Sequence, residues 1–274
     1  MGNDILSTLA HSRLGSIVKS TPGVATVAEK AYDKLREHHA DQYFTENNGI
    51  IEFKLPVIDS VYFKECNLDY NEIKFLNYIL NNVNNGDTIY DIGANIGSHT
   101  IPYSQLFDVI AFEPVQTNRE ILKTNLSIHK ESGGKFGSID IRELALTDRN
   151  GTGQFAIQST SKNRGDRDSE ASFVRSGETD TVSVEMATLD SLELVPPDAM
   201  KIDVEGSELR VLSGATETIE RYNPDIFLET HPEKIKNMGG TMEEVNELLN
   251  SRGYDSTEIL PSNINKEYLH FSIK

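Results

Sequence analysis

Thr88-Ile89-Tyr90-Asp91-Ile92-Gly93-Ala94-Asn95-Ile96-Gly97 decides the fold, and Ala111-Phe112-Glu113-Pro114 completes the pattern. The first stretch predicts a short buried strand that runs into a glycine-bearing turn and then a helix, and the second predicts a strand that ends on an acid. In a doubly wound sheet this pair builds a nucleotide site, because the glycines let a ligand approach the backbone and the acid accepts hydrogen bonds from a ribose. Glu113 lies 22 residues beyond Asp91, close to the expected spacing of about 20.

The turn predicts which nucleotide is bound. It reads GxxxG instead of GxGxxG, and no Lys-Ser/Thr of a P-loop follows, so dinucleotides and nucleoside triphosphates are disfavoured. S-adenosylmethionine has a ribose and an amino-acid tail but no phosphate, and it is the cofactor we expect. Asp91 is then expected to take the α-ammonium of the methionine tail, directly or through water. Gly93 and Gly97 allow close approach, Asn95 offers its amide or shapes the turn, and Glu113 binds the ribose.

The adenine end of the cofactor is assigned to Ala145 and Leu146, which follow the third predicted strand. They could supply an apolar wall and a backbone amide, although the same dipeptide is typical of any strand end. Structural alternatives also remain for the other residues. DIGANIG could be an ordinary strand-to-helix turn, and Glu113 could be a strand end that faces solvent.

Composition limits the class of protein. The single cysteine, Cys66, excludes an internal disulfide framework and a thiolate metal cluster. A formal net charge of −17 marks an acidic protein and argues against nucleic acid as a substrate, because phosphate backbones need a surface of lysine and arginine. No apolar run approaches the ~20 residues that span a bilayer, and no signal-peptide pattern opens the chain. We therefore expect a cytoplasmic protein without a transmembrane segment.

Helices and strands alternate from residue 71 onward, which predicts an α/β domain with a doubly wound, mostly parallel sheet. The domain is placed at 50–274, after a helical extension at 1–49 that either packs on it or meets a partner, and it contains a flexible loop at 159–181. The predicted strands are 50–55, 61–63, 88–91, 108–112, 139–144, 200–204, 225–229, 258–260 and 268–273. The predicted helices are 71–83, 97–106, 117–129, 207–221 and 241–251.

A second motif, Met200-Lys201-Ile202-Asp203-Val204-Glu205-Gly206-Ser207-Glu208, ends the fourth core strand and should face the same crevice as Asp91. With it, the sequence resembles the FkbM family of S-adenosylmethionine-dependent methyltransferases. The resemblance runs from about Asn71 to His231 and rests on DIGANIG, FEP, KIDVEGSE and LETH in that order. It implies a class I (Rossmann-like) methyltransferase fold with a closing antiparallel edge hairpin. It also implies O-methylation of a sugar, a glycan precursor or another small hydroxylated molecule.

A hydroxyl acceptor must lose a proton, so a positioned base or a metal would help. Asp203 is the first candidate, followed by His231 and Glu205. Helix capping is the alternative for the two acids, and an ordinary loop position is the alternative for the histidine. No metal-ligand spacing such as HExxH is present, so the sequence predicts no metal site.

Two other functions remain open at this point. One is a nicotinamide-dependent Rossmann oxidoreductase, which the GxxxG turn and the edge hairpin disfavour. The other is a non-catalytic module that binds S-adenosylmethionine and acts through its N-terminal helices. The acceptor and the oligomeric state are not predicted.

Overall fold

The computed structural model describes residues 70–131, 137–157, 171–173, 181–261 and 266–273. The predicted helical extension, the two predicted strands before residue 70 and most of the predicted loop at 159–181 lie outside this part of the chain. Within the described residues, no helix has both the length and the apolar character that crossing a membrane requires.

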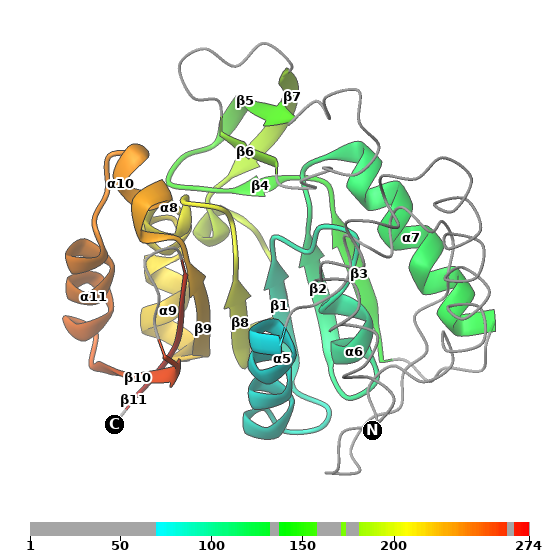
Figure 1. The fold of residues 1–274 in the computed structure, drawn as a ribbon, viewed down its shortest axis with the longest axis horizontal. Helices are drawn as coiled ribbons and strands as arrows, with labels where there is room; N and C mark the ends of the chain where they lie inside the picture. Colours follow the sequence, from blue (N-terminus) through cyan, green and yellow to red (C-terminus); the bar gives the residue numbers. More distant parts are fainter. Residues whose placement is uncertain (1–69, 132–136, 158–170, 174–180, 262–265, 274) are drawn as a thin grey trace, which may run out of the picture. The chain divides into compact units, whose positions relative to one another are not determined.

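A seven-stranded sheet forms the centre of the domain (Figure 1). Its strands run in the order β10 (Tyr254–Leu260), β11 (Glu267–Ile273), β9 (Asp225–Thr230), β8 (Ala199–Ile202), β1 (Thr88–Ile92), β2 (Asp108–Phe112) and β3 (Ile139–Arg142). Neighbours from β9 to β3 pair in parallel, whereas β11 is antiparallel to both of its neighbours. The predicted class I fold is confirmed, including the closing hairpin. The last strand inserts between β9 and β10, so β10 is the outermost strand.

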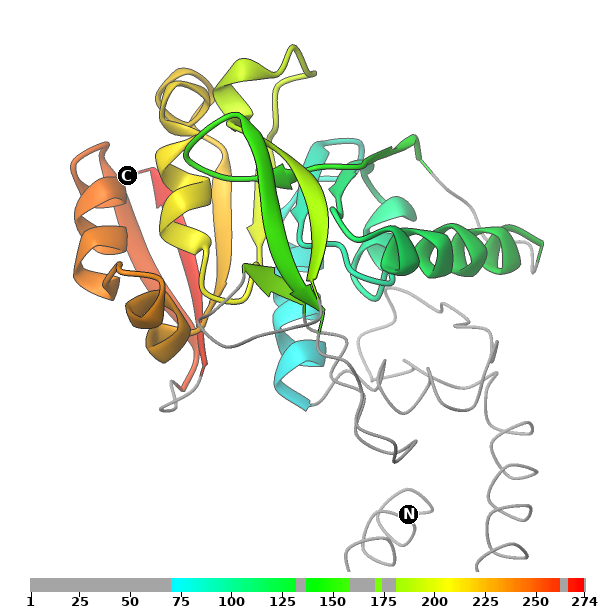
Figure 2. The same cartoon turned by 90° about the horizontal axis from the view of Figure 1, so that it is seen from above.

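Helices cover both faces of this sheet (Figures 1 and 2). They are α5 (Tyr70–Asn82), α6 (Thr100–Ser104), α7 (Gln116–Glu131), α8 (Glu208–Ser213), α9 (Thr216–Tyr222), α10 (Pro232–Asn237) and α11 (Met242–Asn250). On one face, side chains such as Tyr90 and Met200 share a buried core with α8, α9 and α11. On the other face, Tyr78 of α5 stacks edge-on against Phe227, and its hydroxyl hydrogen-bonds Nδ1 of His270 at 3.1 Å. Because both faces are buried, the parallel strands read as continuous apolar runs.

The helix predicted over 207–221 is two helices, α8 and α9. The chain bends at Gly214, where a Cβ would lie 2.0 Å from the carbonyl oxygen of Thr147. Asp190 stabilises the bend: its carboxylate accepts hydrogen bonds from the backbone N–H groups of Glu217 (2.9 Å) and Thr218 (2.8 Å). A carboxylate at that position satisfies amides that the start of α9 leaves without a partner.

A second, four-stranded sheet lies over the carboxyl ends of the central strands (Figure 1). Its order is β4 (Ala145–Leu146), β7 (Thr181–Ala187), β5 (Gly151–Ile157) and β6 (Ala171–Phe173). This sheet was not predicted from the sequence, and β6 falls within the predicted loop at 159–181. The strand signal of β5 is weak because it begins Gly-Thr-Gly, and glycine is depleted in strands. β7 does carry a signal, since its exposed and buried positions alternate.

His99, just before α6, is a buried aromatic residue of the core. Its ring stacks on Tyr103 at 5.8 Å between centroids and meets Phe75 edge-on at 6.3 Å. Burial, followed by the nearby charge of Lys201, lowers the pKa of His99 to about 3. The imidazole is therefore neutral in the folded protein at neutral and mildly acidic pH.

Acid is expected to destabilise the fold through His99. On unfolding, the pKa of His99 rises to about 6.5. Below that pH the unfolded chain therefore binds a proton that the folded protein does not bind. This contribution to stability is fully present above about pH 6.5 and is lost as the pH falls towards 3, with a loss of about 3 kcal/mol near pH 4.5. Urea unfolding at about pH 7 and about pH 4.5 should show a smaller loss in His99→Phe than in the wild type. Some loss should persist in the variant, because the pKa of Asp203 is also lowered in the fold. Equal pH slopes in the two proteins would contradict the assignment.

Candidate active site

A pocket opens where β1, β2 and β8 end, and the small sheet forms its far wall. Five of the residues predicted to bind the cofactor line it: Gly93, Asn95, Glu113, Ala145 and Leu146. Asp203 and Glu205, two of the three predicted catalytic residues, line it as well. The carboxyl ends of neighbouring parallel strands meet at one edge of a sheet, which explains why motifs far apart in the sequence converge here.

Gly93 holds two turns against each other. Its φ of +86° is in the region that favours glycine, and a Cβ there would lie 1.9 Å from the carbonyl oxygen of Asp203. The amides of Gly93 and Ala94 both donate to the carbonyl of Phe112, at 3.1 and 3.0 Å. The turn after β1 is thus fixed to the end of β2 and to the loop after β8.

Gly93→Ala is expected to destabilise the protein by about 3 kcal/mol, because backbone strain and a collision with the Asp203 carbonyl add together. Gly86→Ala is the matched control. Its φ is +91°, but a Cβ there meets nothing within 4 Å, so only the strain of about 1 kcal/mol is expected. Denaturant titration of both variants measures the difference, and equal losses would show that the contact does not constrain the turn.

Gly97 has a different role from Gly93 because it does not line the pocket. Its φ is +94°, and a Cβ would lie 3.1 Å from Leu122 of α7 and 3.7 Å from Ile101 of α6. The glycine therefore lets α6 and α7 pack closely behind the turn.

Glu113 is held in place at the end of β2. Its two carboxylate oxygens each accept a backbone N–H at 2.9 Å, from Asn95 and from Val115, and Asn118 Nδ2 lies 3.4 Å from one of them. Burial raises the pKa of Glu113 to about 7, although these hydrogen bonds favour the ionised form. The side chain is only 4% exposed, yet it lines the pocket.

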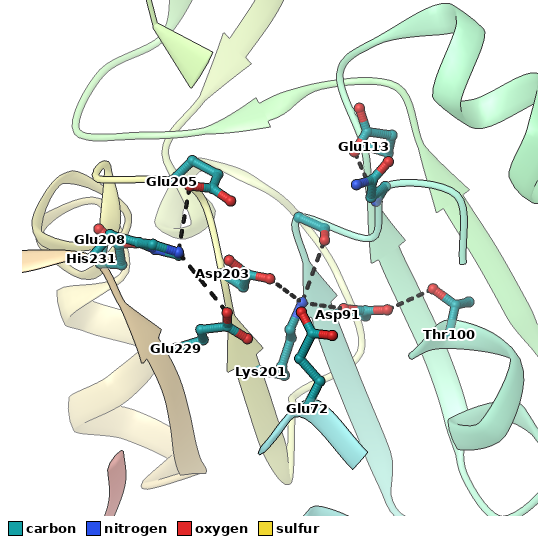
Figure 3. Close-up of polar contacts among 12 residues, drawn as sticks. Glu72, Asp91, Thr100, Glu113, Lys201, Asp203, Glu205, Glu208, Glu229 and His231 are labelled. Atoms are coloured by element: carbon teal, nitrogen blue, oxygen red, sulfur yellow. Dashed lines mark hydrogen bonds and ion pairs between the residues drawn. The ribbon is translucent and has the colours of Figure 1, made fainter. Parts of the chain in front are cut away.

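Asp91 does not line the pocket, because it is buried in an ion-pair cluster beneath it (Figure 3). One carboxylate oxygen accepts a hydrogen bond from the Thr100 hydroxyl at 2.6 Å, and the other lies 3.5 Å from Nζ of Lys201. Lys201 Nζ is also 3.4 Å from Asp203 Oδ2 and 3.4 Å from the Gly93 carbonyl oxygen. Lys201 thus stands between Asp91 and the pocket.

Charges control the protonation of this cluster. Burial alone would lower the pKa of Lys201, but the charges of Asp203 and Asp91 outweigh it and raise the pKa. For Asp203, burial would raise the pKa, and the Lys201 cation reverses the effect and lowers it. The pair is therefore ionised at neutral pH. The Asp203 side chain is 22% exposed, so a ligand can reach it.

Asp203 does not cap α8. That helix begins at Glu208, its N-cap Ser207 accepts no capping hydrogen bond, and the Asp203 carboxylate instead faces Lys201. Glu208 Oε1 accepts the backbone N–H of Gly206 at 3.0 Å, so the alternative of a local structural role suits Glu208 better.

His231 does not line the pocket but lies behind Glu205. Its Nε2 is 3.5 Å from Glu205 Oε2 and 3.9 Å from Glu229 Oε1, and its Nδ1 is 3.5 Å from Glu208 Oε1. Burial opposes a charge on the ring, but the contact with Glu208 and the charges of Glu205 and Asp203 raise the pKa of His231 to about 8.

Glu229 lies beneath the same cluster. Burial, together with the charge of Asp203, raises its pKa to about 8, although Lys266 Nζ lies 2.5 Å from its Oε1. Lys266 also pairs with Glu72 of α5 at 3.6 Å.

Sequence reasoning missed several members of the site. Lys201 was visible in KIDVEGSE, but its role depends on which strands are neighbours. Leu144 was predicted only as the end of the strand at 139–144, and Phe155 belongs to the small sheet, which was not predicted; both line the pocket. Lys266 directly precedes β11, the second strand of the edge hairpin, and no local signal connected it with Glu229.

Comparison with known proteins agrees with these motifs. Residues 91–256, more than half of the chain, match the sequence model of the methyltransferase FkbM domain. The hexuronic acid methyltransferase AglP of Haloferax volcanii is 29% identical over 201 residues, which cover 70% of this chain and 72% of AglP. The resemblance predicted from the four motifs is confirmed by the domain match.

Two solved structures are among those similar to this fold. A methyltransferase FkbM from Methylobacillus flagellatus has a TM-score of 0.46 and 17% identity, covering 69% of this chain and 44% of that protein. Magnesium protoporphyrin IX methyltransferase from Synechocystis PCC 6803 has a TM-score of 0.45 and 10% identity, covering 89% of this chain and 91% of that protein. This chain thus spans less than half of the Methylobacillus protein.

Proposed function

The chain belongs to the FkbM methyltransferase family, and from that premise we propose which residues hold the methyl donor and which class of acceptor receives the methyl group. The predicted activity and cofactor, methyl transfer from S-adenosylmethionine, follow from the family. The alternative of a nicotinamide-dependent oxidoreductase is not favoured. The pocket at the ends of β1, β2 and β8 is the proposed site.

The residues that line the pocket fit an adenosine. We assign the ribose to Glu113, because backbone amides hold its carboxylate and Oε2, which accepts the Asn95 amide, keeps the capacity to accept a further hydrogen bond. Ala145 and Leu146 of β4, with Phe155 of β5, offer an apolar wall for the adenine. Gly93 and Asn95 are assigned to the methionine tail. Asp91 supports them through Lys201, since it does not reach the pocket.

Asp203 and Glu205 are assigned to the acceptor side, with His231 behind them. S-adenosylmethionine supplies a methyl group on a positively charged sulfur, and the acceptor oxygen forms the new C–O bond as the C–S bond breaks with its electron pair left on sulfur. The chain's own contribution is to orient the acceptor hydroxyl and take its proton. We assign the proton to the Asp203 carboxylate, which is ionised and exposed to the pocket.

A sugar is the proposed acceptor, and O-methylation the proposed reaction. The sugar acceptor is supported by the similarity to AglP, a relative whose name states that it methylates a hexuronic acid. The carboxylates of Asp203 and Glu205 can accept hydrogen bonds from the hydroxyl groups of a sugar. A cytoplasmic location and the lack of a nucleic-acid partner stay predictions from the sequence.

Binding and transfer can be tested separately. Calorimetry should show S-adenosylmethionine binding, and Glu113→Ala should weaken it at least about tenfold, because the buried amides of Asn95 and Val115 lose their acceptor. Glu120→Ala, an exposed acid on α7, is the control and should bind normally. No heat in the wild type, or normal binding by Glu113→Ala, would refute the cofactor site.

The acceptor is tested by transfer of a radiolabelled methyl group to hexuronic acids, neutral hexoses and non-sugar alcohols. Label in the sugars supports the proposed acceptor class. Label only in the non-sugar alcohols refutes it and leaves the methyltransferase assignment standing.

A further inference from the structure

Three side chains beside the pocket converge from two loops (Figure 3). Asp203 and Glu205 follow β8, and His231 follows β9. A carboxylate oxygen of each acid and a ring nitrogen of His231 all lie within 4.8 Å of one another. Glu205 has a φ of +55°, which non-glycine residues seldom adopt, so a strained turn directs its side chain. We propose that Asp203, Glu205 and His231 bind a divalent cation.

His231 is the observation that separates this cluster from an ordinary group of acids. Its side chain is 3% exposed, and its Nε2 has no hydrogen-bond partner among the described residues although it is directed at Glu205 and Glu229. Its Nδ1 faces the Glu208 carboxylate at 3.5 Å. Histidines that ligate metals commonly use the second nitrogen in this way, because a carboxylate there fixes the ring and leaves the first nitrogen available.

The charge of the cluster also favours a cation. Around this point the carboxyl groups outnumber the lysines: Glu72, Asp91, Asp203, Glu205, Glu208 and Glu229 meet Lys201, Lys234 and Lys266. Burying carboxylates without matching positive charge costs free energy. Asp203 and Glu205 are 22% and 16% exposed, so an ion can enter from the pocket. Lys234, which pairs with Glu205, is the competing cation.

The donor set indicates the kind of ion. Two carboxylates and one imidazole suit Mn²⁺, which accepts both oxygen and nitrogen ligands, better than Mg²⁺, which prefers oxygen alone. Ligands at about 2.1 Å from an octahedral ion lie at most about 4.2 Å apart. Adjacent ligands of such an ion lie about 3.0 Å apart. The three candidate ligand atoms lie within 4.8 Å of one another, so binding would draw them closer together. The remaining positions of the ion would be open to the pocket.

Such a cation explains how an acidic pocket can hold an acceptor oxygen. A bound dication offsets the carboxylate charge, binds a hydroxyl or carboxylate oxygen directly and lowers the pKa of a bound hydroxyl. The cation site goes beyond the methyl transfer proposed above, and it can be tested without an acceptor or the methyl donor.

The experiment is a Mn²⁺ titration of the full chain at about pH 8, followed by the loss of the EPR signal of the free ion. Wild type should bind one Mn²⁺, and Asp203→Asn and His231→Gln should each weaken binding at least about tenfold. His270→Gln is the matched control, because His270 also faces a carboxylate, that of Asp225 at 2.9 Å, but at the opposite end of β9. It should bind like the wild type. Lys234→Met should bind at least as tightly, because the competing charge is gone.

Absence of binding in the wild type overturns the proposal, and so does undiminished binding by either ligand variant, equal weakening by His270→Gln, or weaker binding by Lys234→Met. Circular dichroism of each variant establishes that it is folded. Calorimetry with S-adenosylmethionine on the same samples separates this result from the proposed function, because the donor site can be intact whether or not Mn²⁺ binds.

Discussion

Lys201→Met is expected to lower the free energy of unfolding by about 3–5 kcal/mol. The Lys201 side chain is 2% exposed and its Nζ lies within 3.5 Å of carboxylate oxygens of Asp91 and Asp203. Methionine can fill the space of the lysine stem but cannot supply the charge. The variant therefore leaves Asp91, which is completely buried, without its cation, and breaking one side of a buried pair costs more than the pair itself contributes.

The control for this prediction is Lys123→Met. Lys123 also pairs with a carboxylate, that of Glu143 at 3.2 Å, but both side chains are more than half exposed. Exposed pairs contribute about 0–1 kcal/mol, so denaturant titration should detect little change. The double variant Lys201→Met/Asp91→Asn should recover part of the loss, because one uncompensated charge is removed. Similar losses for Lys201→Met and Lys123→Met would contradict the proposed role of the buried cation.

Asp203→Asn is expected to lower kcat by about 10²–10⁴-fold, the usual contribution of a positioned proton acceptor. Asparagine keeps the size of the side chain and can still accept a hydrogen bond from Lys201, but it cannot take a proton from the acceptor. The KM for S-adenosylmethionine should stay within about threefold, because the proposed adenosine contacts come from Glu113 and β4. Single-turnover transfer to the sugar that the acceptor panel identifies measures the chemical step.

Asp225→Asn is the matched control for that experiment. Asp225 opens β9 and pairs with His270 at 2.9 Å, so it is an aspartate in a charged contact at the other end of the sheet. Its kcat should equal that of the wild type. If kcat of Asp203→Asn falls by less than about threefold, the proton goes elsewhere and Asp203 has only an electrostatic role.

Much of the central sheet could be predicted because its strands are apolar on both faces. β2 has the predicted bounds, 108–112, and β1 extends the prediction by one residue to Ile92. Buried parallel strands need no alternation to be recognised, and the glycines and the acid at their ends mark where each one stops. The small sheet was missed because the glycines of β5 weaken its strand pattern, and because its partner β6 is only three residues long.

The site was harder to predict wherever a role depends on strand pairing. Asp91 and Lys201 are 110 positions apart in the chain, but they are register partners on β1 and β8. Only the sheet order places that cation beside that acid, so the sequence, which predicted a ligand for Asp91, gave no sign of its buried partner. The position of Glu113 at the pocket depends less on distant pairing, because Val115 is 2 residues away and Asn95 is 18 residues away in the preceding motif.

The apolar wall and the acids of the pocket are encoded in separate parts of the chain. β4 and β5 supply Ala145, Leu146 and Phe155 of the wall, while the ends of β2 and β8 supply the acids Glu113, Asp203 and Glu205. Insertions, deletions and exchanges between β3 and β8 can consequently reshape the cavity while the reactive groups keep their positions. The shape of the cavity and the positions of its carboxylates are therefore set by different segments, so either can be altered by substitutions that leave the other segment unchanged.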